Sequence, residues 1–166
     1  MIHRDRAHRA SLSRLAAPRL VALLALAALA LGVAAAAGAQ EVRLRGLGGE
    51  ELRDADLSQG TTIIVVWASW SPRGRDIVGR VNALTGRWGS QARVITVNFQ
   101  EDRPTVEAFL AGKGLRAPVF LDTDGAFAKR YAVTNLPGLL VVQNGDPAYR
   151  GKLPDDPDAV LAEIVR

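Results

Sequence analysis

The residues best placed to do chemistry lie in one short stretch. The apolar, β-branched run from Thr61 to Val66 leads directly into residues 67–74, which read W-A-S-W-S-P-R-G. Such a run followed by a turn predicts a strand that leads into the N-terminus of a helix. Backbone N–H groups are unpaired there and carry partial positive charge, so an anion or a thiolate at Ser71 would be stabilised.

Few residue types are available to support chemistry at this position. The chain has no cysteine, and its two histidines (His3, His8) and single methionine (Met1) all precede residue 40. The remaining chain therefore lacks the usual ligands of zinc, copper and haem. A Ser-His-Asp or Cys-His arrangement is also impossible there. We expect no metal site and no cofactor.

The first 39 residues have the pattern of a secretory signal peptide. Five arginines precede an apolar run from Leu20 to Ala37, and Ala37-Gly38-Ala39 provides a small-residue cleavage site. The pattern predicts a signal peptide over residues 1–39 and one mature domain over residues 40–166, exported to the periplasm or secreted. The alternative is a retained membrane anchor, because the apolar run is almost long enough to span a bilayer.

The charge of the predicted mature chain is balanced. The whole chain has 21 Lys and Arg, 17 Asp and Glu, and a formal net charge of +4. Residues 1–39 hold five of the basic residues and one of the acidic ones, which leaves 16 of each kind. Binding to nucleic acid or to an anionic membrane requires a basic patch. We therefore expect no nucleic-acid partner, and membrane contact only through a retained N-terminal segment.

Strand and helix patterns alternate around the candidate site. Apolar residues recur at Ile77, Val81, Leu84 and Trp88, which predicts a helix with one buried stripe. This helix would connect the strands Thr61–Trp67 and Arg93–Phe99 in a right-handed crossover. The other expected elements are a short edge strand near 42–47, a helix from Asp102 to Leu110, a strand over 118–121, a helix bearing Phe127 and Tyr131, a hairpin over 139–153 that turns at Asn144-Gly145, and a last helix that begins at Pro157.

Residues 67–74 resemble the W-A-S-W-C-P-x-C active site of thioredoxin-like proteins, in particular exported TlpA/ResA-type thiol–disulfide oxidoreductases. The order of elements is also similar to that family. The resemblance implies an α/β, thioredoxin-like three-layer α/β/α sandwich. Its central mixed sheet would carry an extra strand–helix insertion and an N-terminal extension. Ser71 stands where the family has its attacking cysteine, and Gly74 where it has the resolving cysteine.

These two departures remove the redox chemistry of the family. Disulfide exchange needs a thiolate nucleophile and a second thiol to resolve the mixed disulfide. The hydroxyl of Ser71 is far less acidic than a thiol, and Gly74 has no side chain. Val65 also stands where plain thioredoxins have a buried acid. The chain acting alone therefore has no catalytic residue for disulfide reduction or oxidation.

The chain does retain residues that match the peptide-binding loop of the family. Residues 133–137 resemble its cis-proline loop, which implies a cis Leu136–Pro137 bond and backbone groups that hold an extended peptide. From the residues alone, a trans proline that begins a strand is the alternative. Arg73 and Arg75 would pair with an acidic ligand group, unless they form a solvated helix face. The resemblance assigns ligand binding to Trp70, Ser71, Pro72, Arg73, Leu136 and Pro137.

Three functions follow from this reading. The first is a redox-inactive exported domain that binds a protein or an extended peptide through the former active-site groove. The second is binding or transfer of a thiol ligand such as glutathione, because some glutathione transferases of the same fold use a serine hydroxyl at this helix N-terminus to stabilise a thiolate. The third is an oxidoreductase of the family that has lost its cysteines and has no present ligand.

Overall fold

The chain divides into two units, Met1–Gln40 and Glu41–Arg166, and the computed structural model describes residues 41–165 of the second. The predicted signal peptide over residues 1–39 lies outside the described residues. Within residues 41–165, no helix is long and apolar enough to cross a membrane.

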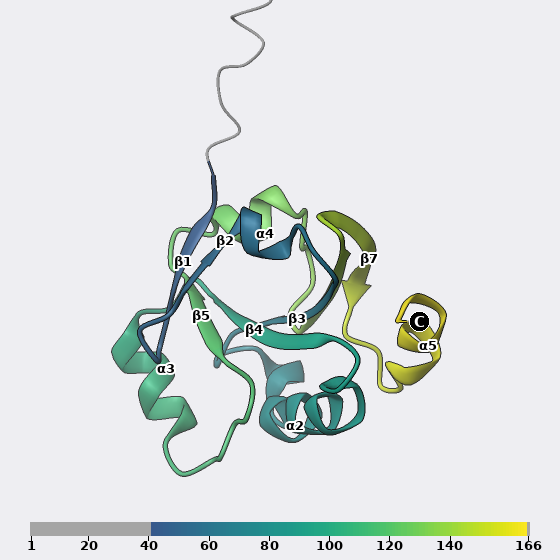
Figure 1. Cartoon of the computed structure of the whole chain (residues 1–166). Helices are drawn as coiled ribbons and strands as arrows, with labels where there is room; N and C mark the ends of the chain where they lie inside the picture. Colours follow the sequence, from purple (N-terminus) through teal and green to yellow (C-terminus); the bar gives the residue numbers. More distant parts are fainter. Residues whose placement is uncertain (1–40, 166) are drawn as a thin grey trace, which may run out of the picture. The chain divides into compact units, whose positions relative to one another are not determined.

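One mixed sheet of seven strands forms the centre of the domain, in the order β2-β1-β5-β4-β3-β6-β7 (Figure 1). β3, β4 and β5 run parallel to one another, and the remaining neighbours are antiparallel. The strands are β1 (Arg43–Gly46), β2 (Glu51–Arg53), β3 (Thr61–Trp67), β4 (Arg93–Phe99), β5 (Val119–Asp122), β6 (Gly138–Gln143) and β7 (Asp146–Lys152).

Helices cover both faces of this sheet. They are α2 (Ile77–Trp88), α3 (Arg103–Leu110), α4 (Ala126–Arg130) and α5 (Asp158–Ile164), with short 3-10 turns η1 (Asp54–Leu57) and η2 (Pro72–Gly74). Apolar residues of α2, α3 and α5 pack in one core cluster, and those of α4 and η1 pack in a second cluster across the sheet. The predicted three-layer α/β/α sandwich is therefore confirmed.

β3 is buried on both faces, which explains its unbroken apolar sequence. Ile63, Val65 and Trp67 belong to the cluster under α2, whereas Ile64 and Val66 belong to the cluster under α4. All five are fully buried. The strand that carries the candidate site is thus fixed from both sides, so the turn that follows it has a rigid starting point.

The N-terminal extension differs from its prediction in one respect. The edge strand expected near 42–47 is β1, and it is not at an edge, because it pairs with both β2 and β5. The edge is the three-residue β2, which is too short to show a periodic pattern. Asp54 then fastens the extension to α4: its carboxylate accepts hydrogen bonds from Val42 N (3.1 Å) and Tyr131 Oη (3.0 Å) and pairs with Arg130 (3.2 Å).

The C-terminal hairpin was predicted correctly. β6 and β7 are antiparallel neighbours joined at Asn144 and Gly145, whose φ angles are 51° and 92°. Positive φ at both positions is what a type I′ turn requires, and Asn-Gly adopts it readily. β6 begins directly after Pro137, so this hairpin places the proline loop beside the end of β3.

Candidate functional site

Ser71 lies in a short 3-10 turn rather than at the start of the long helix. Its backbone N–H donates to Ala68 O (3.2 Å), and Gly74 N donates to Ser71 O (2.9 Å). α2 begins only at Ile77, because Asp76 (φ −107°, ψ 34°) separates it from η2. The helix N-terminus expected at Ser71 is therefore that of the short turn η2, and not that of α2. Ser71 is the N-cap of η2, and its side chain makes no capping bond.

The hydroxyl of Ser71 instead joins two distant segments. Its Oγ donates a hydrogen bond to Leu136 O at 3.0 Å, across 65 positions of sequence. The Leu136–Pro137 bond is cis, which confirms the prediction from the loop sequence. Ser71 is only 5% exposed. The hydroxyl thus links the turn after β3 to the proline loop. Its proton is engaged in this hydrogen bond in the folded protein.

The surroundings of Gly74 leave room for a Cβ atom. A Cβ at this position would lie 3.7 Å from the Cβ of Ser71, 3.5 Å from Ala68 O and 4.0 Å from Pro137 Cγ, all ordinary contact distances. The two Cβ atoms of a disulfide are separated by about 3.5–4.5 Å. Positions 71 and 74 therefore keep the separation of a cysteine pair without the sulfur atoms.

The three tryptophans have different environments. Trp67 and Trp88 are 0% and 4% exposed and lie in the core, as the buried stripe predicted for Trp88. Trp70 is 61% exposed and is the exposed large hydrophobic side chain of the described residues. It directly precedes Ser71, whose hydroxyl is bonded to the proline loop. Its role as an apolar platform for a ligand stays a prediction.

A buried acid next to the site was missed by the sequence analysis. Glu101 is 8% exposed and follows β4, the parallel neighbour of β3. Its carboxylate accepts hydrogen bonds from Ser69 N (2.7 Å), from Asn98 Nδ2 (2.7 Å) and from Ser69 Oγ. Glu101 therefore holds the turn that presents Trp70. The available signal was a polar pair, Asn98 and Glu101, at the carboxyl end of a buried strand adjacent to β3.

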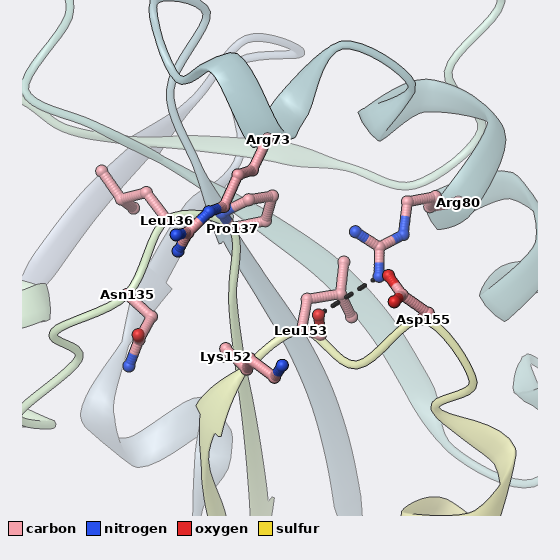
Figure 2. Close-up of a pocket in the computed structure, with 8 residues that line it drawn as sticks. All are labelled: Arg73, Arg80, Asn135, Leu136, Pro137, Lys152, Leu153 and Asp155. Carbon is pink, nitrogen blue, oxygen red and sulfur yellow. Dashed lines mark hydrogen bonds between the residues drawn. The ribbon is translucent and has the colours of Figure 1, made fainter.

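A pocket of about 480 Å³ lies beside the proline loop (Figure 2). It brings together three of the predicted binding residues, Arg73, Leu136 and Pro137, whereas Trp70, Ser71, Pro72 and Arg75 do not line it. The sequence analysis missed the remaining lining residues, which are Arg80, Asn135, Lys152, Leu153 and Asp155. They come from α2, the proline loop and the end of β7, so only the fold brings them to one place.

One wall of the pocket is held in place by Arg80. Its guanidinium donates to Leu153 O at 3.2 Å, drawn as the dashed line in Figure 2, and also to Pro154 O. These bonds join α2 to the segment between β7 and α5. Among residues 41–165, no group of three or more His, Asp or Glu side chains is placed to hold a metal ion. The chemistry that the site offers is hydrogen bonding, apolar contact and positive charge.

Comparison with known proteins identifies the family of the chain. The sequence model of the AhpC/TSA family matches residues 35–150. No curated protein matches the chain at a significant level.

Solved structures with a similar fold come from several bacteria. The exposed lipoprotein thioredoxin Etrx1 of Streptococcus pneumoniae is 19% identical with a TM-score of 0.65, over 75% of this chain and 97% of that chain. StoA of Bacillus subtilis is 21% identical with a TM-score of 0.62, over 75% and 96%. A thiol:disulfide interchange protein of the thioredoxin family from Chlorobium tepidum is 18% identical with a TM-score of 0.62, over 76% and 94%. These similarities show the thioredoxin-like fold.

Proposed function

Because the chain belongs to the AhpC/TSA family and has no cysteine, we propose that it is a redox-inactive thioredoxin-like domain that binds an extended segment of another protein. Disulfide exchange requires thiols that this chain does not contain. The segment would lie in the groove beside Trp70, Ser71 and the Leu136–Pro137 loop. Pro72 and Arg73 of η2 would form its other side.

The observation that carries this proposal is that the backbone of Leu136 has hydrogen-bonding groups left unused. Its carbonyl accepts one hydrogen bond, from Ser71 Oγ, and a carbonyl oxygen has a second lone pair. Its N–H has no hydrogen-bond partner within residues 41–165. Extended peptides bind by pairing their main chain with free backbone donors and acceptors of this kind. Leu136 therefore offers a donor and an acceptor that do not depend on any thiol.

Trp70 supports the same function. Tryptophan is enriched among the residues that dominate binding energy, because its large ring buries much area at low entropic cost. At 61% exposure, Trp70 contributes little to the core and remains available to a ligand. A main-chain pairing site next to an exposed aromatic ring is a suitable surface for a peptide.

We place this binding outside the cytoplasm. The support is the signal-peptide pattern of residues 1–39, with the run from Leu20 to Ala37 as an anchor if it is not removed. The similar protein of Streptococcus pneumoniae is described as an exposed lipoprotein. The partner would then be another exported protein.

Selection of peptides tests the proposal directly. The purified protein is used to select from a displayed library of random peptides, and the affinity of the selected sequences is measured by fluorescence anisotropy. Trp70→Ala should weaken binding about fivefold or more, because the loss of such a residue costs more than about 1 kcal/mol. Leu136→Asp is a poorer variant, since Leu136 also packs against the second core cluster. Unchanged affinity in a folded Trp70→Ala protein would exclude this groove.

The thiol-ligand alternative has less support. To stabilise a bound thiolate, Ser71 would have to break its hydrogen bond to Leu136 O and leave a nearly buried position. A glutathione titration of the wild-type and Ser71→Ala proteins separates the two functions. Binding at millimolar concentration that disappears in Ser71→Ala would favour the thiol ligand over the peptide.

A further inference from the structure

The pocket beside the proline loop carries an excess of positive charge. Arg73, Arg80 and Lys152 line it, against the single carboxylate of Asp155. The excess is local, since residues 40–166 contain equal numbers of basic and acidic residues. The pocket is therefore positive because the fold gathers these side chains, and not because the domain is basic.

Two of the three cationic side chains have no partner among residues 41–165. Arg80 donates to main-chain carbonyls between β7 and α5, so it is anchored. Arg73 and Lys152 form no ion pair within the described part of the chain. In Figure 2, Arg73 extends from η2 down to Leu136 and Pro137, and Lys152 lies below them at the end of β7. An anion between them would be approached from two directions.

We propose that this pocket selects an acidic side chain, so that the partner of the domain is an extended acidic peptide segment. The inference rests on the proposed function, since Leu136 and Pro137 line the pocket and a segment paired with Leu136 must pass it. Arg73 would hold the carboxylate through charge-assisted hydrogen bonds, and Lys152 would add a point charge. An apolar side chain there would displace water from both cations and give them no hydrogen bonds in return, which costs free energy.

The neighbouring surface limits the acidic ligand to a short stretch. A second pocket, of about 250 Å³, continues from the first along α2 and shares Arg80, Leu153 and Asp155 with it. It also contains Asp156 and Asp158, so carboxylates gather there, and Arg87 is already paired with Asp158 at 3.6 Å. A long polyanion would be repelled at this end. One or two acidic residues within an otherwise neutral segment fit the charge pattern better than nucleic acid does.

Matched peptide pools test the inference. Two pools of fluorescein-labelled peptides share random flanking residues and differ only at two fixed central positions, which are Glu in one pool and Gln in the other. We expect the Glu pool to bind the wild-type protein about fivefold more tightly at low salt. The advantage should shrink at high salt, because the cations are partly exposed and ions screen them.

Exposed arginines on the same turn provide the control. Arg73→Ala and Lys152→Ala should each remove most of the preference for Glu, whereas Arg75→Ala should keep it, since Arg75 lies outside the pocket. All three side chains are exposed, so the variants are expected to fold.

The possible failures are distinguishable. Equal binding of both pools that is lost in Trp70→Ala would overturn the selection for acid while leaving the peptide groove in place. An equal loss of preference in Arg75→Ala would also overturn it, because general surface charge would then be responsible. Binding of neither pool, together with no peptide selected from the random library, would overturn the proposed function itself.

Discussion

Replacing both Ser71 and Gly74 by cysteine is expected to return a disulfide to the turn after β3. The Cβ of Ser71 and a Cβ at position 74 would be 3.7 Å apart, within the range of about 3.5–4.5 Å found in disulfides. Apart from its two chain neighbours, a Cβ at position 74 would meet no atom closer than 3.5 Å. The backbone therefore needs no rearrangement for the bond to form.

The stabilisation can be worked from the length of the closed loop. A bond that closes four residues removes about 6 cal/mol/K of entropy from the unfolded chain, or about 2 kcal/mol at 25 °C in the loop-closure model. Ser71→Cys also removes the hydroxyl that donates to Leu136 O, a loss of about 1 kcal/mol. The oxidised variant should thus melt roughly 6–10 °C above its reduced form, and only slightly above the wild type.

Thiol titration and thermal melts measure this outcome. After oxidation, the double variant should show no free thiol, and its melting temperature should fall on addition of a reductant. The single variant Ser71→Cys is the control, since its melting temperature should not respond to reductant when the protein is monomeric. Two thiols that remain free after oxidation would refute the conclusion that positions 71 and 74 keep the geometry of a cysteine pair.

Two further predictions concern the stability of the frame. Gly138→Ala should destabilise the fold by about 1–3 kcal/mol, because its Cβ would lie 2.7 Å from Asn135 O. The matched variant Gly86→Ala, in open space on α2, should stabilise it by roughly 0.5–1 kcal/mol, and urea unfolding compares the two. Burial raises the pKa of Asp122, although two backbone N–H groups of α4 that donate to its carboxylate act in the opposite direction. The native state then binds this proton more tightly than the unfolded chain, so the contribution of Asp122 to stability grows as the pH falls through the raised native pKa towards about 3.9. The unfolding free energy of the wild type minus that of Asp122→Asn should therefore rise as the pH falls through that window. A value that stays constant or decreases would contradict the raised native pKa.

The parts of the fold that sequence predicted well are those with a local physical cause. β3 and β4 have the predicted bounds because their β-branched runs are buried on both faces. The turn at Asn144 and Gly145 follows from the backbone preferences of those two residues. The cis bond before Pro137 followed from family resemblance, because composition alone gives a cis proline little support.

The details of the site depended on contacts between distant segments. The partner of the Ser71 hydroxyl is a carbonyl 65 positions away, and Glu101 reaches back 32 positions to Ser69. Lys152 enters the pocket only because β7 returns beside β6. Periodicity reports which face of an element is buried, and it does not report which of two distant polar groups will meet. Of the six residues predicted to bind a ligand, only Arg73, Leu136 and Pro137 line the pocket.

The proposed function needs none of the thiol chemistry that the chain lacks. Thiol exchange would require sulfur at positions 71 and 74, and both are absent, while the hydroxyl of Ser71 takes over a purely connecting role. The groups suited to hold a peptide are the main chain of Leu136, the ring of Trp70 and the charges of Arg73 and Lys152, and none of them needs a thiol to act. Trp70, Arg73 and Lys152 add little to the stability of the fold, because exposed side chains away from the core contribute little. Arg73 and Lys152 nevertheless line the pocket beside the proline loop, and this placement supports the proposed binding of an acidic peptide segment.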